Sequence, residues 1–390
     1  MTSTANQAPD FNIVQNARYL IKKGFFKQAD ELLTTRMKSN GAHLNEKFEW
    51  IRIALLTGAY GNAHSRIETV KNKPEHFGFT EIEIELLRRE LKFQDALSKL
   101  DVLINQVGST AKYEELRRVI EACQNLETTL SKLPSSELKY VCYCINLDEQ
   151  DQKWERCLRV AGHSNLSLNR VEGLRGTYLP NSILDRFGKN VDPNFKGTLG
   201  CFISHYRAWE QFLDSKMAFA LILEDDFIPR IRLPKDFVAL GLPSDFDICW
   251  LNERMASLHS SGFSFVGVKD IVKARASPDW AACGGDAYLI SRQGAKNLLS
   301  YIAEDGFYGD VDWRMASYSL NREDVASLPI TSYARWAIEA HLRVIRSRES
   351  LRSFATSIGL FGTVDSGSIR EEMNNGQHAH VGISDLTKVL

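Results

Sequence analysis

Residues 218–223 form an unbroken apolar run, Ala-Phe-Ala-Leu-Ile-Leu, and three carboxylates follow it directly, Glu224, Asp225 and Asp226. A short apolar run that ends in a loop before Pro229 is typical of a strand buried on both faces. Because side chains alternate along a strand, we expect Glu224 and Asp226 to face the same way and Asp225 the other. Adjacent carboxylates repel one another and are costly to bury without partners, so this segment constrains the whole fold.

The acidic segment allows two interpretations. Carboxylate oxygens that converge at the carboxyl edge of a sheet suit Mg2+ or Mn2+, held together with the phosphates of a substrate. In that case Glu224 and Asp226 are the metal ligands. Alternatively, the same carboxylates cap a helix or pair with nearby arginines. The residues alone leave both interpretations open.

Composition excludes several classes of protein. The chain has 390 residues, of which 44% are apolar and 25% charged, so it is long enough for two ordinary globular domains. A net charge of -1 gives no electrostatic basis for binding nucleic acid, and no signal peptide or transmembrane helix is visible. The seven cysteines lack zinc-type spacing, which indicates reduced thiols. We expect a cytoplasmic protein, with peripheral attachment to the inner membrane as an alternative.

Residues 11–133 have a helical pattern that contains a repeat. In each unit an aromatic residue stands three positions before an alanine: Phe26 and Ala29, Tyr60 and Ala63, Phe93 and Ala96. The alanines are 34 and then 33 residues apart, which is the period of a tetratricopeptide helix-turn-helix unit. A generic helical bundle is the alternative. We expect these repeats to recruit a protein partner and to be unnecessary for any chemistry.

A Leu-Pro-Ser-Ser segment at residues 133–136 ends the helical pattern. Residues 140–147 are rich in β-forming side chains and precede a charged amphipathic segment, a pattern that opens an α/β domain. We expect that domain to cover residues 137–345. The remaining residues, 346–390, are expected to form a partly mobile C-terminal extension.

Polar residues that are candidates for a binding or catalytic site lie on both sides of the acidic segment in the sequence. Residues 197–213 have the pattern of a helix, and we expect Ser204 and His205 in its first turns, where free N–H groups favour a diphosphate. A hydrogen-bonded core histidine is the alternative for His205. Asp310 and Asp312 stand at strand spacing and add two more carboxylates.

Segments of the second half occur in an order that resembles glycosyltransferase family 25, the lipooligosaccharide galactosyltransferase group. The resemblance covers about residues 139–320. The segments that carry it are residues 145–147, the helix with Gly200, Ser204, His205 and Trp209, residues 221–226, residues 288–295 and residues 310–312.

Three features depart from the family pattern. The residues after Leu147 lack an arginine pair, and Gly285 and Asp286 stand where small or apolar residues are usual. Residues 226–280 diverge, and we expect them to select the acceptor.

The resemblance implies an α/β GT-A fold, a Rossmann-like domain whose acidic metal-binding motif ends a central strand. It implies a nucleotide-sugar donor, with UDP-galactose as the first expectation, and Mn2+ or Mg2+ as the cofactor. The transfer would be inverting, to a glycan acceptor such as a lipopolysaccharide, a capsule or a protein-linked glycan.

The resemblance also suggests roles for individual residues. Glu224 and Asp226 would hold the metal, with Glu224 on the metal or the ribose, while Asp225 would hold the backbone. The residues expected to line the donor site are Asn146, Ser204, His205, Glu224 and Asp225. The expected catalytic base is Asp310 or Asp312, with Asp286 as the third candidate.

Two other functions remain open at this point. One is a non-catalytic scaffold in which the repeats carry a transferase-like binding domain. The other is a metal-dependent phosphodiesterase that uses the same carboxylates. The donor sugar, the acceptor and the ligand of the repeats do not follow from the sequence.

Overall fold

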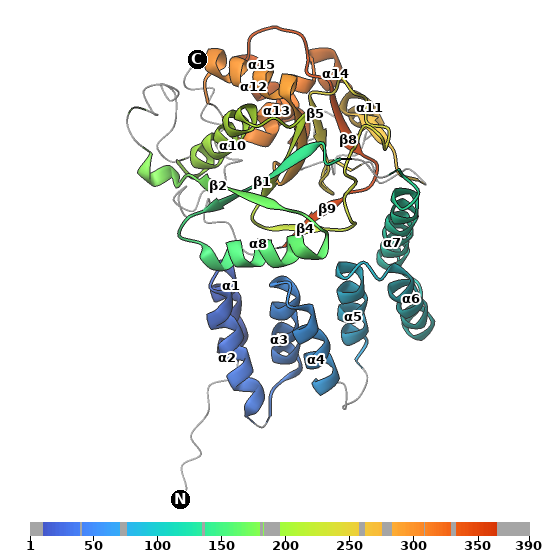
Figure 1. Cartoon of the computed structure of the whole chain (residues 1–390). Coiled ribbons are helices and arrows are strands. Elements are labelled where there is room, and N and C mark those ends of the chain that lie inside the picture. The colour runs from blue at the N-terminus through green and yellow to red at the C-terminus, as the bar shows by residue number, and fades with distance from the viewer. Residues whose placement is uncertain are drawn as a thin grey trace, which may run out of the picture.

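The computed structural model describes residues 11–39, 41–70, 76–134, 137–179, 182, 196–256, 262–274, 283–307, 309–328 and 333–364. An all-helical N-terminal part is followed by an α/β part built on a seven-stranded sheet, and helix α8 (Asp151–His163) lies between them (Figure 1). None of the helices in these ranges has the length and apolar character needed to cross a membrane. All seven cysteines are described and are free thiols, as the sequence predicted.

The N-terminal part consists of helical hairpins. Its helices are α1 (Phe11–Lys22), α2 (Phe26–Lys38), α3 (Leu44–Leu56), α4 (Tyr60–Val70), α5 (Phe77–Arg89), α6 (Phe93–Val107) and α7 (Ala111–Leu130). Helix α1 packs on α2, α3 on α4, α5 on α6, and α7 on α6. The aromatic and alanine positions of the repeat are all buried. The helical repeat is therefore confirmed, whereas its tetratricopeptide assignment remains a prediction.

The turn between α3 and α4 requires glycine for two reasons. Gly58 has a φ of +72°, in the left-handed region that L side chains rarely adopt. In addition, a Cβ at this position would lie 2.9 Å from Cγ2 of Val160 in α8. The glycine seen in the sequence repeat thus allows a hairpin turn to lie directly against the α/β part.

The main sheet is mixed. Its strands are β1 (Tyr140–Leu147), β2 (Leu168–Gly173), β3 (Phe219–Glu224), β5 (Ile248–Trp250), β6 (Phe265–Gly267), β7 (Ala287–Ser291) and β8 (Ser353–Thr356), in the order β2-β1-β3-β7-β5-β8-β6. Strand β1 is parallel to β2 and β3, while β7 runs antiparallel to β3 and β5. Strands β4 (Phe227–Pro229) and β9 (Phe361–Thr363) form a small second sheet. The acidic strand β3 is therefore central, as expected.

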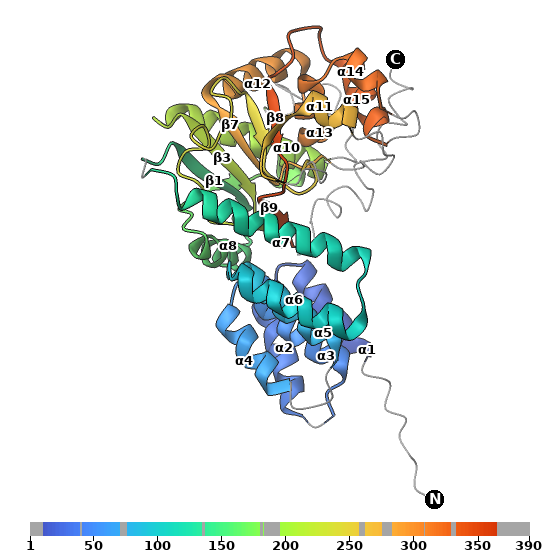
Figure 2. The same ribbon diagram turned by 90° about the vertical axis from the view of Figure 1, so that its right-hand side faces the viewer.

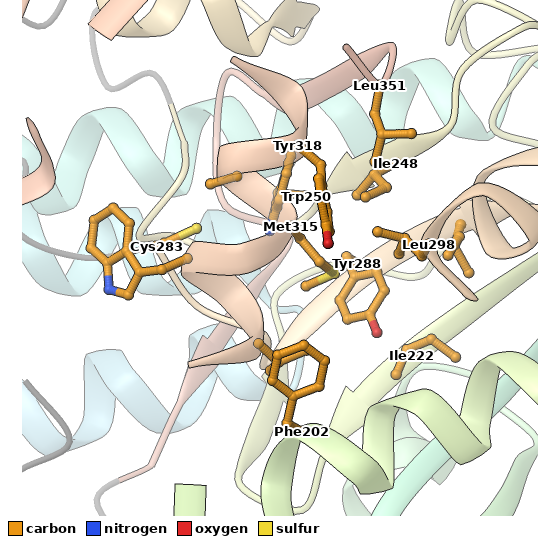
Figure 3. Close-up of a cluster of buried hydrophobic side chains, with 14 of the residues drawn as sticks. Phe202, Ile222, Ile248, Trp250, Cys283, Tyr288, Leu298, Met315, Tyr318 and Leu351 are labelled. Atoms are coloured by element: carbon orange, nitrogen blue, oxygen red, sulfur yellow. The ribbon is translucent and has the colours of Figure 1, made fainter. Parts of the chain in front are cut away.

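Helices cover one face of this sheet. After α8, the described helices are η1 (Gly176–Tyr178), α10 (Lys196–Asp214), α11 (Val268–Ala274), α12 (Arg292–Asp305), α13 (Val311–Ser319), α14 (Arg322–Ala326) and α15 (Tyr333–Val344). Ile222 of β3 belongs to the apolar core that contains Phe202 of α10, Tyr288 of β7 and Met315 of α13 (Figure 3). This core holds the sheet against α10, α12 and α13.

The opposite face of β3 is covered partly by the N-terminal helices. Leu221 lies in a second apolar core together with Leu100 of α6 and Leu126 of α7. Figure 2 shows α7 between α6 and the strands of the α/β part. Since burial of apolar area is the main driving force of folding, this shared core ties the helical part to the α/β part. The expectation that the repeats recruit a protein partner remains a prediction.

The C-terminal boundary at residue 345 is wrong. Strand β8 pairs in parallel with β5 in the main sheet, and β9 pairs with β4. Both strands come from the segment that we assigned to a C-terminal extension, so the α/β part continues to at least Val364. Each strand is very short, which explains why the sequence pattern did not show it. Residues 365–390 lie outside the described part of the chain.

We expect Leu126→Ala to destabilise the α/β part as well as the helices. Leu126 is 2% exposed, and truncating a buried leucine costs about 2–5 kcal/mol. Hydrogen exchange should show lower protection of β3 in this variant. Leu33→Ala is the matched control, since Leu33 is equally buried but lies in the separate core of α1 and α2. Unchanged protection of β3 in Leu126→Ala would contradict the shared core.

Candidate active site

The acidic segment leaves the sheet after Glu224. Strand β3 ends at that residue, Asp225 and Asp226 form a turn, and β4 starts at Phe227. The alternation that predicted opposite directions for Asp225 and Asp226 therefore does not extend through the segment. The two side chains nevertheless have different environments, because the turn separates them.

Asp225 is held by polar partners on β1 and α8. Its Oδ2 accepts a hydrogen bond of 2.7 Å from Nδ2 of Asn146, and Nζ of the buried Lys153 lies 3.5 Å from Oδ1. The amide oxygen of Asn146 in turn accepts a bond of 2.6 Å from Arg170. Asp225 thus has polar partners, although these are an asparagine and a lysine and not the arginines of the sequence interpretation. Asn146 and Asp225, both candidates for donor binding, are used here to fix the acidic turn.

Asp226 has a different environment. No group in the described part of the chain donates a hydrogen bond to its buried Oδ1, although the residue is partly exposed as a whole. Burial, together with the nearby carboxylates of Glu224 and Asp286, raises the pKa of Asp226 to about 8. A carboxyl group in this state is costly to ionise unless a cation neutralises it.

Asp286 completes the group of carboxylates. It stands immediately before β7, and its backbone carbonyl accepts a bond of 3.0 Å from the N–H of Glu224. The residue is 1% exposed, and its Oδ2 accepts no hydrogen bond from the described residues. Burial is the main cause that raises its pKa to about 7; Arg254 opposes the rise and Glu224 adds to it.

The sequence analysis missed two residues beside this group, Asn252 and Arg254. Both follow β5, and Nδ2 of Asn252 and Nη2 of Arg254 each lie 3.3 Å from Oδ1 of Asp286. Burial disfavours the charged guanidinium, but Asp286 and Glu224 outweigh it and raise the pKa of Arg254. Their sequence signal is the polar triplet at residues 252–254, which follows a buried strand. Ligands of α/β folds bind at the edge of the sheet where such strands end.

His205 orients Glu224 from within the core. The histidine is fully buried; its Nδ1 lies 2.9 Å from the hydroxyl of Tyr288, and its Nε2 lies 3.3 Å from Oε1 of Glu224. Ligand atoms of His205, Glu224 and Cys201 all lie within 4.8 Å of one another, a spacing that could hold a metal ion. The hydrogen-bonded interpretation of His205 is therefore correct, and it contacts the acidic segment as well.

The expected position of Ser204 and His205 in the first turns of α10 is wrong, while their role in lining a donor site remains a prediction. Helix α10 begins at Lys196, so Ser204 and His205 lie well past its first turn, where backbone N–H groups are used within the helix. The hydroxyl of Ser204 donates to the carbonyl of Gly200 at 2.7 Å and accepts from the N–H of Leu174 at 2.8 Å. Ser204 thus holds the helix to the segment after β2.

Asp310 and Asp312 do not lie on a strand. Asp310 is the N-cap residue of α13, and Asp312 lies in the first turn of that helix. Two carboxylates at positions i and i+2 are compatible with a strand and with the start of a helix. Here the segment is helical, and the side chains of α13 that follow are buried in the core. Asp310 is buried, whereas Asp312 is partly exposed and is close enough to Arg254 and Asp286 to affect their pKa values. Asp312 is therefore the better placed of the two.

Gly285 packs closely against Glu224 and His205. A Cβ at this position would lie 3.3 Å from Oε1 of Glu224 and 3.3 Å from Cε1 of His205. Contacts of that length are tighter than ordinary van der Waals contacts, so glycine lets the backbone approach Glu224 and His205 closely. Glu224, Asp226 and Asp286 are close enough for their charges to raise the pKa values of Asp226 and Asp286, and the three form a carboxylate cluster beside Arg254. The described side chains whose ligand atoms already lie close enough to share one metal ion are Cys201, His205 and Glu224.

Comparison with known proteins identifies one region. Residues 140–239 match the family model described as glycosyltransferase family 25 (LPS biosynthesis protein). This range contains β1, α8, α10, β3 and the acidic turn. The resemblance drawn from the sequence is confirmed for this part of the chain.

Curated relatives share the similarity over a longer stretch. Procollagen galactosyltransferase 2 of Homo sapiens is 20% identical over 270 residues, which cover 65% of this chain and 41% of the relative. Procollagen galactosyltransferase 1-A of Xenopus laevis is 24% identical over 188 residues, 44% of this chain and 30% of the relative. Inactive glycosyltransferase 25 family member 3 of Mus musculus is 28% identical over 188 residues, with the same coverage of 44% and 30%. The chain spans less than half the length of these relatives.

Asp226→Asn should stabilise the metal-free protein at high pH. The ordinary pKa of this carboxyl is 3.8, and its value in the folded chain is about 8. An acid with a raised pKa costs stability once it must ionise, so the cost grows between these two pH values. With a chelator present, the variant should be more stable than wild type by about 1 kcal/mol or more at pH 8, and this advantage should shrink towards pH 5. Melting curves at several pH values measure it.

Asp225→Asn is the matched control for that prediction. Its carboxylate is hydrogen bonded and lies beside buried Lys153, so the variant should lose about 1–3 kcal/mol. If Asp226→Asn were also destabilising at pH 8, Asp226 would have a structural partner and the cluster would not be poised for a cation.

Proposed function

Because residues 140–239 form a glycosyltransferase family 25 region, we propose that the chain is a metal-dependent glycosyltransferase that moves galactose from UDP-galactose to an acceptor hydroxyl. The observation that carries the proposal is the carboxylate cluster at the end of β3. Asp226 and Asp286 each have a buried oxygen that accepts no hydrogen bond from the described residues. Buried carboxylates without partners are costly, and functional sites are where such a cost is tolerated.

The oxygen donors present suit a divalent cation, which would draw the three carboxylates closer together than they lie in this structure. Glu224, Asp226 and Asp286 supply hard oxygen donors, the ligands that Mn2+ and Mg2+ prefer. When bound, the cation would neutralise the negative charge of the departing diphosphate. Asp286 thus changes from a candidate base to a proposed metal ligand, beside the expected pair Glu224 and Asp226.

The chain's own residues would prepare this site. The hydrogen bond between His205 and Glu224 fixes one donor, while Asn146 and Lys153 fix the turn through Asp225. Arg254, the cation beside Asp286, can stabilise charge on the donor diphosphate. Because these groups are held before the substrate binds, little reorganisation is needed during the reaction.

We assign the catalytic base to Asp312. Its carboxylate would take the proton of the acceptor hydroxyl as the oxygen bonds to the anomeric carbon. The bond from that carbon to the diphosphate breaks on the opposite side, so the configuration inverts and UDP leaves. Asp312 is partly exposed and starts a helix, where a carboxylate is stabilised by the helix dipole.

The fold supports the GT-A assignment. Strand β3 is central, its acidic end lies between the ends of β1 and β7, and β7 is antiparallel to its neighbours. Relatives named procollagen galactosyltransferases make galactose the favoured sugar, and the family description points to a lipopolysaccharide or related glycan acceptor. The free cysteines favour a reducing, cytoplasmic location.

A relative named as inactive gives weight to a second candidate, a non-catalytic binding protein. The products of one incubation separate three candidates. A transferase with UDP-galactose and Mn2+ should release UDP slowly without acceptor and faster with a glycan acceptor. A phosphodiesterase should release galactose phosphate, and a binding protein should release neither product.

Mn2+ dependence provides a sharper check of the transferase. A chelator should abolish UDP release, and Mn2+ with UDP should raise the melting temperature of wild type, because a ligand stabilises the state that binds it. Asp226→Asn should lose both effects, whereas Asp225→Asn should keep the thermal response. Metal-independent release of UDP would refute the proposed role of the cluster.

Asp312→Asn should lower kcat by about 10²-fold or more while the KM for UDP-galactose stays near that of wild type. Asp310→Asn is the informative comparison, because asparagine is also a good N-cap residue and should keep α13 intact. Steady-state kinetics of both variants decide the assignment. A large loss in Asp310→Asn alone would transfer the role to Asp310, and normal turnover in both would place the base elsewhere.

A further inference from the structure

Arg156 of α8 connects the helical repeats to the acidic turn. Its side chain is fully buried. Within the described part of the chain, all the hydrogen bonds that its guanidinium donates go to backbone carbonyls. Nη2 donates to the carbonyl of Phe227 at 2.8 Å and lies 3.5 Å from the carbonyl oxygen of Asp226. Nη1 donates to the carbonyl of Asp225 at 3.1 Å. One side chain therefore holds three successive carbonyls of the segment that carries the carboxylate cluster.

The fourth acceptor of Arg156 comes from the helical part. Its Nε donates to the carbonyl of Leu56 at 2.9 Å. Leu56 ends α3, where the last carbonyls have no partner within the helix and carry the negative end of its dipole. A guanidinium has donors in a fixed planar arrangement, so it can connect acceptors on two elements only while both keep their positions.

Neighbouring contacts hold the same two elements together. In α8, Nε of Arg159 donates to the carbonyl of Thr57 at 2.9 Å, and Nε2 of His163 lies 3.2 Å from that of Gly58. These acceptors form the turn that follows α3. Figure 1 shows α8 lying across the ends of the first repeat helices, with the sheet on its other side.

We propose that Arg156 is a positioning residue for the acidic turn and that the helical repeats are thereby a working part of the active site. This role rests on the proposed function, since the turn matters for activity only if its carboxylates bind the cation. Movement of the turn between α3 and α4 would be transmitted through one buried guanidinium to residues 225–227. This reverses the expectation that the repeats are unnecessary for the chemistry.

Arg156→Lys tests the first step. Lysine keeps the charge but cannot connect Leu56 with three carbonyls, whereas Arg159→Lys alters the same helix without touching the acidic turn. Hydrogen exchange in the full chain should become faster by about tenfold for the amides of residues 224–228 in Arg156→Lys and stay unchanged in Arg159→Lys. Protection of β1 should stay unchanged in both, which excludes general unfolding.

Titration with Mn2+ tests the consequence for binding. Residues that hold metal ligands in place typically affect affinity by about 10–100-fold, and Arg156→Lys should weaken Mn2+ binding within that range. Arg159→Lys should bind Mn2+ as wild type does. Unchanged exchange and unchanged affinity in a folded Arg156→Lys variant would overturn the positioning role.

A change on the repeat side tests transmission from the helices. Gly58→Ala places a methyl group 2.9 Å from Cγ2 of Val160 and should displace the turn from α8. Gly41→Ala is the matched control, because Gly41 also has a positive φ, of +94°, but a Cβ there would meet nothing within 4 Å. Only Gly58→Ala should accelerate exchange at residues 224–228 and weaken Mn2+ binding. Equal behaviour of the two variants would refute transmission.

The two proposals fail in different ways. Absence of Mn2+ binding by the wild type would refute the metal-dependent function, and the exchange data would still decide whether Arg156 positions the turn. Mn2+ binding that is normal in wild type, Arg156→Lys and Gly58→Ala would preserve the function and refute the positioning role.

Discussion

Burial of β3 on both faces is the constraint on which the rest of the structure depends. Its alternating side chains belong to two cores, one with Ile222 against α10 and one in which Leu221 shares an apolar cluster with α8, residues 231–246 and the repeat helices. A strand of this kind is stable only if both layers are present. The repeats contribute Leu100 and Leu126 to the second core, so the repeats and the sheet share a core although their sequence patterns look like two domains.

The polar end of the same strand depends on a balance of charge. Asp225 has Asn146 and Lys153 as partners, whereas Asp226 and Asp286 each have a buried oxygen that accepts no hydrogen bond from the described residues, and Asp286 has Arg254 nearby. Similar carboxylates in adjacent positions thus have different roles because their surroundings differ. Rigid packing on both faces of β3 keeps the like charges close in the absence of a cation, an arrangement that favours binding of one.

Features with local signals were predictable from the sequence. Strand β3, its carboxylates and the helical repeats all followed from local patterns. The proximity of Arg254 to Asp286 did not, because it arises from the antiparallel pairing of β5 with β7, which no local pattern encodes. The same reason applies to β8, whose partner β5 lies about one hundred residues earlier. Asp310 and Asp312 were placed on the wrong element because two residues cannot distinguish a strand from a helix start.

The position of β8 has a consequence for the order of folding during synthesis. The helical hairpins are made of local contacts and can form as soon as they leave the ribosome. The main sheet, in contrast, cannot be completed until residues 353–356 pair with β5 and β6. Until then, the second apolar core, to which Leu100 and Leu126 belong, lacks the residues of the later strands. The first-made helices are therefore expected to act as a template on which the later strands assemble.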